Sequence, residues 1–247
     1  YTLDEARSLA VRTAFKQMYD DGLIYRGYRP VNWSVKGQST CSDDELVYID
    51  RKAILYTFKY SKDFPIAVST TRPETKLGDV AVAVHPHDER YTEFVGKTFT
   101  IDSFAGGTRL SIKIIADEMV DPSFGTGAVG ITPTHSHTDY DFYLRHKNEI
   151  DPDESTIVDV IGTDGNMTPF AGDVYKNLTV LEARKEIITS LRDAELLEKE
   201  EEINQSVGTS DRYEDVNEVI PMKQWFINAN KEFHRDGRTV SLKQLMR

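Results

Sequence analysis

Two segments decide how this sequence is interpreted: Ser69-Thr-Thr-Arg-Pro-Glu-Thr75 and Gly125-Thr-Gly-Ala-Val-Gly-Ile-Thr-Pro-Thr-His-Ser-His-Thr-Asp139. The first segment gathers several hydroxyl groups around one guanidinium. The second joins a glycine-rich turn to a proline and ends in a carboxylate at the start of a predicted helix. Hydroxyl, guanidinium and carboxylate groups can hydrogen-bond a polar ligand, so both segments are candidates for a binding site.

Outside these segments the composition is ordinary for a globular protein. The 247 residues, 39% hydrophobic and 29% charged, can bury a full core as one large domain or as one domain with appendages. No apolar run approaches the ~20 residues needed to span a bilayer, and no signal-like start is visible. The single Cys41 excludes an internal disulfide and a multi-cysteine zinc site. We expect a cytoplasmic monomer with no membrane partner.

The hydrophobic pattern predicts a β-rich domain of the α+β class from about Val47 onward. Short β-branched runs bounded by turn residues predict strands over residues 53–60, 66–71, 80–84, 111–116 and 157–161. Helical spacing predicts one helix from Thr2 to Gly22, one over 138–146 and one over 180–202, with its charged end at 198–202 in solvent. We predict a β-barrel-like arrangement with peripheral helices.

Two patterns in the second segment suggest other kinds of site. Gly125–Gly130 spells G-x-G-x-x-G, but a dinucleotide-binding site needs a helix that begins within the glycines. Pro133 cannot lie inside a helix begun at Gly127, so we expect no such site. His135 and His137 have a spacing that zinc ligands can have, but no third ligand stands at a recognisable spacing. We expect these histidines to make local hydrogen bonds or to lie in solvent.

The two segments resemble the paired motifs of the editing domain inserted in the valyl-, isoleucyl- and leucyl-tRNA synthetases, which are class I enzymes. The longer match over Thr70–Tyr91 looks most like the valyl members. Leu23–Trp33 and Ile220–Ile227 resemble the places where the chain of these enzymes leaves and re-enters the catalytic core. The resemblance implies a flanking segment from the catalytic core with linker strands over 1–46, an editing domain over 47–204, and a return linker with re-entry to the core over 205–247.

The resemblance also implies roles for individual residues. It places Asp139 against the α-ammonium of a mischarged amino acid, which suits a carboxylate where water is partly excluded. Arg72, Thr70 and Thr71 would join it as catalytic residues that orient the ester carbonyl and the attacking water. The implied substrate-binding residues are Thr75, Phe124, Gly125, Gly127, Gly130, Thr132 and Ser136, and no metal ligand is implied. The glycines would let the backbone approach the terminal ribose and adenine closely.

Residue chemistry alone leaves structural alternatives open for the same positions. Asp139 also suits a helix start, where the dipole stabilises an acid, and threonines suit strands and caps. Two positions depart from the valyl pattern. Gly130 stands where valyl enzymes usually carry Lys, isoleucyl enzymes His and leucyl enzymes Met, and Ser136 stands where valyl enzymes commonly have Asp. Two polar contacts that bear on recognition of a threonine hydroxyl are therefore missing.

The implied reaction is hydrolysis of the ester that links threonine to the 3′-terminal adenosine of valine tRNA. An apolar valine site discriminates against threonine by only ~100-fold, so a second site must admit threonine and exclude valine. No Ser-His-Asp or Cys-His arrangement is discernible, so we expect attack by a positioned water, without a metal or organic cofactor. The alternatives are a non-hydrolysing insertion that only shapes tRNA binding, an isoleucyl- or leucyl-type editing domain, and an unrelated nucleotide-binding module.

The net charge of −11, from 30 basic and 41 acidic residues, disfavours tight binding of nucleic acid. Affinity for phosphates depends on Lys and Arg that neutralise backbone charge. If the chain acts on the 3′ end of tRNA, we expect its own affinity for tRNA to be low and salt-sensitive, with a larger parent protein delivering that end.

The parent enzymes use ATP and Mg through a His-Ile-Gly-His-like tetrapeptide and a Lys-Met-Ser-Lys-Ser-like loop, and neither occurs in this sequence. We therefore predict that the purified 247-residue chain catalyses no valine-dependent exchange of pyrophosphate into ATP. Exchange measured above a control without protein would overturn the assignment of the chain to the editing region.

Overall fold

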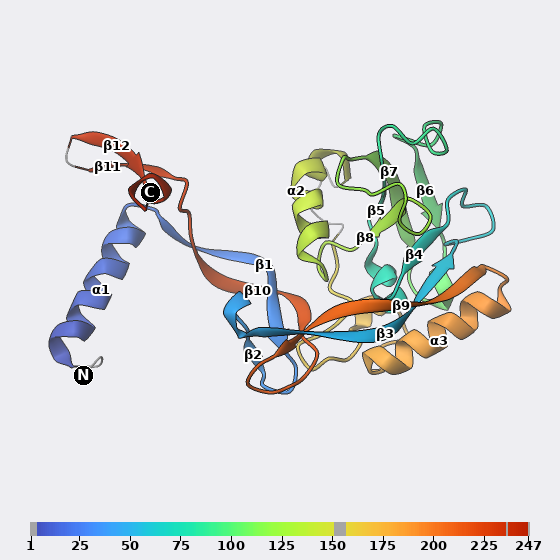
Figure 1. Cartoon of the computed structure of the whole chain (residues 1–247), viewed down its shortest axis with the longest axis horizontal. Helices are drawn as coiled ribbons and strands as arrows, with labels where there is room; N and C mark the ends of the chain where they lie inside the picture. Colours follow the sequence, from blue (N-terminus) through green and yellow to red (C-terminus); the bar gives the residue numbers. More distant parts are fainter. Residues whose placement is uncertain (1–3, 151–156, 236, 247) are drawn as a thin grey trace. The chain divides into compact units, whose positions relative to one another are not determined.

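The computed structural model describes residues 4–150, 157–235 and 237–246, which form two compact units (Figure 1). Residues from Pro30 to Pro221 make the larger unit; those up to Arg29 and from Met222 make the smaller one. Two strands, β1 (Ile24–Ser34) and β10 (Glu218–Ile227), run through both units, and β1 also pairs with β2 (Ser39–Thr40). The predicted three-part division, with boundaries at 47 and 205, remains a prediction.

The larger unit is built on a four-stranded mixed sheet in the order β6-β7-β5-β8. Its strands are β6 (Thr98–Ile101), β7 (Leu110–Ala116), β5 (Ala81–Val84) and β8 (Ala128–Ile131). β5 and β7 run parallel, and the two outer pairings are antiparallel. The register of β5 with β8 places Val82 opposite Gly130. The second motif therefore lies beside the strand that follows the first motif.

Both faces of this sheet are covered by apolar side chains. Successive side chains of β5 point to opposite faces, as the period of a strand requires. Val82 and Val84 join the hydrophobic cluster that includes the apolar side of α3 (Val180–Asp193). Ala81 and Ala83 join a second cluster with Phe142 of α2 (His137–Ile150). The strand between the two motifs is consequently buried on both sides and fixed in position.

A second sheet, β4-β3-β9, holds the first motif. β3 (Leu46–Phe58) and β9 (Leu197–Ser210) form a long antiparallel ribbon, and Figure 1 shows α3 alongside it. β4 (Val68–Thr70) pairs with the end of β3, with Tyr56 opposite Thr70. The 3-10 helix η2 (Pro73–Gly78) follows, and all of its residues are buried. The other 3-10 helices are η1 (Asp43–Glu45), η3 (Phe104–Gly106) and η4 (Pro169–Ala171).

Several sequence predictions differ from this structure. The predicted helix over 180–202 ends at Asp193, and residues 198–202 belong to β9, because pairing with β3 overrides the helix propensity of Glu and Lys. The strand predicted over 157–161 contains only an isolated bridge between Ile161 and Met167. The short strands β6 and β8 were not predicted. In the part of the chain that is described, the fold is mixed α/β with four separate sheets and no closed barrel, so the barrel-like arrangement is not confirmed.

The smaller unit contains α1 (Glu5–Asp20), β11 (Glu232–Arg235), β12 (Arg238–Ser241) and α4 (Leu242–Leu245). The N-cap of α1 is Asp4, while the predicted cap Thr2 lies outside the described residues. The helix ends just before Gly22, whose φ of +65° is typical of glycine after a helix. Phe15 and Trp225 make an edge contact at 5.3 Å between ring centroids.

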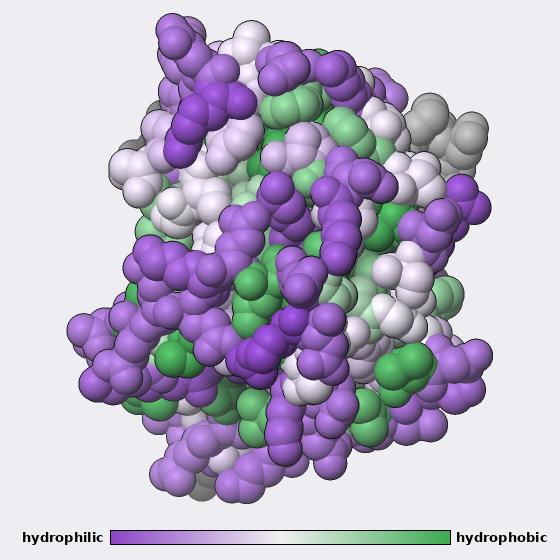
Figure 2. All heavy atoms as spheres, turned by 90° about the vertical axis from the view of Figure 1, so that its right-hand side faces the viewer, coloured by the Kyte–Doolittle hydropathy of each residue, from purple (hydrophilic) through white to green (hydrophobic). Residues whose placement is uncertain are grey.

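The outer surface is polar over much of its extent. Figure 2 shows one face on which hydrophilic side chains predominate and hydrophobic ones are scattered among them. Among the described helices, none has the length and apolar character needed to cross a bilayer.

Phe58 tests the main hydrophobic cluster. It is fully buried and contacts Phe104 at 5.6 Å between ring centroids. Phe58→Ala should lower the free energy of unfolding by about 3–5 kcal/mol, because a large cavity replaces the ring. Val47→Ala on the same strand is a control, since Val47 is 47% exposed and should change stability by about 0.5 kcal/mol or less. Urea denaturation measures both, and equal small losses would contradict this core.

Candidate active site

The two motifs meet at one cavity of about 210 Å³. Most of the predicted site residues line it: Thr70, Thr71, Arg72, Thr75, Gly130, Thr132, Ser136 and Asp139. The lining also contains Ser69, Lys76, Val129 and His135, which were not predicted to belong to the site. The end of β4 and η2 supply one side; β8 and the entry to α2 supply the other.

Three predicted residues lie outside the cavity lining, in the turn before β8. Phe124 is 56% exposed and does not line the cavity. Gly125 and Gly127 have φ values of +58° and +75°, which favour glycine. A Cβ atom on Gly125 would lie 2.8 Å from Oγ of Ser69, so this glycine lets the turn pack against the cavity edge. A strand, β8, follows the glycines, so no helix begins within them.

Asp139 presents a carboxylate at the cavity wall. It lies in the first turn of α2 and is 9% exposed. Its Oδ2 accepts a hydrogen bond of 2.8 Å from the backbone N–H of Thr132. Burial raises the pKa of Asp139, while the positive charge of Lys76 and hydrogen bonds from Thr132 and Ser136 oppose this rise. An ionised carboxylate offers about four lone pairs, so Asp139 can still bind a ligand that carries hydrogen-bond donors.

Arg72 is held by carboxylates on its outer side. Its Nε donates to Oε1 of Glu74 at 3.1 Å, and its Nη2 donates to Oε2 of Glu218 at 2.6 Å. Glu74 is fully buried and also accepts two hydrogen bonds from Arg184, of 2.7 and 2.8 Å. Burial alone would lower the pKa of Arg72, but Glu218 and Glu74 outweigh it and raise the pKa. The guanidinium is therefore held in place, and three of its five N–H groups, two on Nη1 and one on Nη2, have no acceptor among these carboxylates and could serve the ligand-orienting role predicted from the sequence.

The three threonines of the first motif keep different hydrogen-bonding capacities. Thr70 Oγ1 accepts from the backbone N–H of Arg72 at 3.0 Å, and Thr71 Oγ1 accepts from Nε2 of Gln205 at 3.1 Å. Both hydroxyls can still donate their protons. Thr75 Oγ1 instead donates to the backbone carbonyl of Arg72 at 3.0 Å, which leaves its lone pairs as acceptors.

His135 is committed to the backbone. Its Nδ1 lies 3.0 Å from the carbonyl of Val219, and its Nε2 accepts from the N–H groups of Val160 and Ile161 at 3.0 and 3.2 Å. These partners assign a neutral ring protonated on Nδ1, and burial lowers the pKa of His135 to about 4. The ring has no nitrogen left for a metal or for a proton transfer. His137 is exposed, and its Nε2 lies 2.9 Å from Oδ1 of Asn32, a residue distant in the sequence.

Below the cavity lies a buried charged cluster that sequence reasoning missed. Lys76 Nζ donates to the carbonyl of Gly130 at 2.7 Å, to Oγ1 of Thr132 at 2.9 Å and to Oδ1 of Asp79 at 3.1 Å. Asp79 also accepts from the hydroxyls of Thr132 and Tyr60. A Cβ atom on Gly130 would clash with Asp79 and Tyr60, so this cluster requires glycine there. An ammonium supplied by η2 thus binds the backbone of β8 at Gly130.

The one sequence signal for this cluster was the spacing of Lys76 and Asp79 on either side of buried residues. Four cavities among the described residues are larger, with volumes of about 290, 360, 440 and 520 Å³. The cavity of about 520 Å³ runs along β3 and β9 and shares Thr71 and Arg72 with the site, and the cavity of about 440 Å³ includes Leu77. None of the four is lined by Asp139, so they lack the carboxylate that lies at the meeting point of both motifs. In the described part of the chain, no group of three or more metal-ligating side chains is found.

Comparison with known proteins assigns the chain to a family. The family of tRNA synthetases class I (I, L, M and V) matches residues 1–244. The chain belongs to this family. It is 40% identical over 250 residues to the valine–tRNA ligase of Protochlamydia amoebophila, covering 100% of the chain and 24% of that protein. It is 44% identical over 230 residues to the valine–tRNA ligase of Carboxydothermus hydrogenoformans, covering 92% of the chain and 25% of that protein.

The chain therefore spans about a quarter of the length of these relatives. The valine–tRNA ligase of Aquifex aeolicus gives the same picture, with 42% identity over 246 residues, 93% of the chain and 20% of that protein. Among solved structures, a ternary complex of Agrobacterium radiobacter K84 LeuRS with tRNA and LeuAMS matches 99% of the chain and 37% of its own. Its identity of 16% and TM-score of 0.37 are too low to establish a shared arrangement.

The neutral, buried His135 predicts a dependence of stability on pH. Its pKa falls from the ordinary 6.5 to about 4 on folding, so between these values the unfolded chain binds a proton that the folded chain does not. The contribution of the neutral His135 ring to the free energy of unfolding is complete above about pH 6.5. It is lost as the pH falls toward 4, by up to ~1.4 kcal/mol per pH unit. Urea unfolding at several pH values measures this slope, and imidazole NMR reports the ring directly. Protonation of His135 in the folded protein near pH 6 would contradict the arrangement.

Proposed function

We propose that this chain is the editing region of a valine–tRNA ligase and hydrolyses threonine wrongly esterified to valine tRNA. The observation that carries the proposal is the convergence of both motifs on one cavity, with the carboxylate of Asp139 at its wall. The valine–tRNA ligase relatives support the choice of parent enzyme. The resemblance of the motifs to the editing domain supports hydrolysis.

The size of the cavity suits the amino-acid part of the substrate. Its volume of about 210 Å³ is below the ~300–1,000 Å³ of sites that enclose drug-sized ligands. An aminoacyl group would enter it, while the terminal ribose and adenine would remain at its mouth. The mouth in this proposal is the place where the turn at Gly125 packs against Ser69.

The polar groups of the cavity match those of a threonyl ester. The carboxylate of Asp139 would accept from the α-ammonium, as a charge-assisted hydrogen bond. The hydroxyls of Thr70 and Thr71 would donate toward the ester carbonyl or the attacking water. Thr75, whose own proton is engaged, would accept from the threonine hydroxyl, and valine has no such donor. A buried acceptor left unpaired by valine would favour threonine.

The reaction then proceeds by attack of water. The water oxygen adds to the ester carbonyl carbon, the bond from that carbon to the ribose oxygen breaks, and a proton passes to the ribose oxygen. The products are free threonine and a tRNA with its terminal hydroxyl restored. Because both nitrogens of His135 are engaged, this ring is not the base, and rate enhancement rests on orientation and electrostatics.

Asp139→Asn tests this proposal with little change of shape. The asparagine oxygen can still accept from Thr132 N, whereas Asp139→Ala would leave that buried N–H unpaired at a cost of ~1–3 kcal/mol. We expect the Asn variant to fold normally and to lose about 100-fold in single-turnover deacylation of threonyl-tRNA, the loss of a charge-assisted contact of ~2–3 kcal/mol.

The matched control is Asp141→Asn, which removes the same charge from an exposed position on the same helix. It should leave deacylation unchanged. Hydrolysis at the wild-type rate by a folded Asp139→Asn variant would refute the ammonium-binding role. A wild-type chain that binds the charged tRNA end without hydrolysing it would favour the non-hydrolysing insertion instead.

A further inference from the structure

Two carboxylates and one ammonium are buried together beneath the cavity. The side chains of Lys76 and Asp79 are 7% and 0% exposed, and Asp139 is 9% exposed. The three hydrogen bonds of the Lys76 ammonium all go to protein oxygens, so its donors are used. Asp79 accepts from Lys76, Thr132 and Tyr60. The Lys76 side chain lines the cavity, but its ammonium has no donor left for a ligand.

Thr132 connects this pair to Asp139. Its hydroxyl accepts from Lys76 and donates to Asp79, while its backbone N–H donates to Oδ2 of Asp139 at 2.8 Å. Thr132 is thus held by hydrogen bonds of both its hydroxyl and its backbone N–H. Any movement of the Lys76 ammonium changes the position of the group that orients the Asp139 carboxylate.

The charges of the cluster sum to minus one when all three groups are ionised. Lys76 offsets Asp79, which leaves Asp139 as the uncompensated charge at the cavity wall. Without Lys76, two carboxylates would share a buried region with no cation between them, and like charges in such a site cannot both stay ionised. A proton taken up by Asp139 would turn an anion into a neutral group that no longer attracts a cation.

We propose that Lys76 is a positioning residue of this site: by neutralising Asp79 and fixing Thr132, it makes Asp139 the single negative charge that faces the ligand. Gly130 is required for the same arrangement of residues, because a Cβ atom there would displace Asp79 and lie 3.2 Å from Cδ of Lys76. The inference rests on the proposed function for the identity of the cationic ligand, but its electrostatic part concerns this chain alone.

The test follows the ionisation of Asp139 in the full 247-residue chain. Carbon-13 NMR of labelled aspartate side chains gives the titration midpoint, and the resonance is assigned by its loss in Asp139→Asn. The titratable and charged groups that face Asp139 are Lys76, Asp79, Tyr60, Arg72 and His135. Burial raises the pKa of Tyr60, so its charge does not change where a carboxylate titrates. The pKa of His135, about 4, lies in the carboxylate range, so the imidazole resonances of His135 are followed in the same titration.

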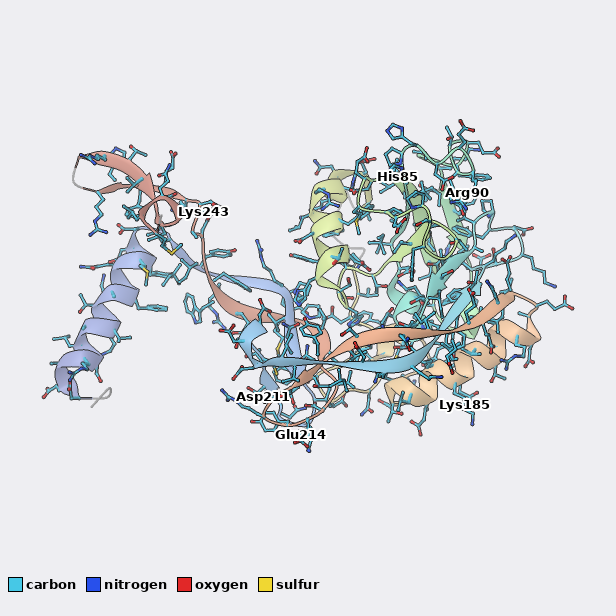
Figure 3. The ribbon with its side chains drawn as sticks, viewed as in Figure 1. His85, Arg90, Lys185, Asp211, Glu214 and Lys243 are labelled. Atoms are coloured by element: carbon cyan, nitrogen blue, oxygen red, sulfur yellow. The ribbon has the colours of Figure 1, made fainter. Side chains whose placement is uncertain are left out.

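Three variants are expected to change the titration midpoint of Asp139 in different ways. Lys76→Met should raise the midpoint of Asp139 by about one pH unit or more, which is the effect of losing a nearby opposite charge. Asp79→Asn, which retains Lys76, should lower it. Lys76→Met combined with Asp79→Asn should return it toward the wild-type value. Lys185→Met is the control, because Lys185 is exposed on α3 (Figure 3) and its loss removes the same charge from the chain.

A midpoint unchanged in Lys76→Met, or still raised in the double variant, would overturn the proposal. If Lys76→Met does not fold, Asp79→Asn decides, since a midpoint that fails to fall contradicts the charge balance. Single-turnover deacylation of threonyl-tRNA supplies the functional readout: its acid limb should move to higher pH in Lys76→Met. If the wild-type chain hydrolyses nothing, the proposed function fails, while the titrations still decide the role of Lys76.

Discussion

The hydrogen bonds of the buried Lys76 ammonium join the two motifs on which the site depends. A buried cation is stable only when all its donors are paired and its charge is balanced. Here the partners come from β8, from the residue after β8 and from Asp79, which follows η2. The pairing of β5 with β8 brings these groups together, and hydrophobic clusters on both sheet faces keep the strands in register.

The proposed action of an acidic chain on tRNA can be explained when its charges are considered locally. Arg72, which lines the cavity, and Arg184 are neutralised by Glu74 and Glu218, so these guanidiniums add little attraction for phosphate. The carboxylate of Asp139 instead suits a cationic group. Neutralised guanidiniums together with an anionic Asp139 fit the proposal of a site that recognises an aminoacyl group, with the nucleic acid held by other parts of a longer protein.

The sequence analysis named most of the residues that line the cavity, but several predicted elements of the fold were wrong. Asp139, Arg72 and the threonines were singled out because their motifs resemble a known family, and η2 and β8 bring them to one cavity. Lys76 was missed because two of its three partners, Gly130 and Thr132, lie far away in the sequence and a lysine is usually exposed. The helix predicted across residues 198–202 failed because a long-range strand pairing decides that segment, and local propensity cannot detect it.

The most direct measurement of the central claim is single-turnover hydrolysis by the wild-type chain of valine tRNA charged with threonine or with valine. The account predicts release of threonine well above the spontaneous rate, with valine released little faster than without protein. Addition of excess chain compensates for weak binding. Equal spontaneous rates for both esters at saturating chain, or faster release of valine, would contradict the claim that this cavity is an editing site for threonine.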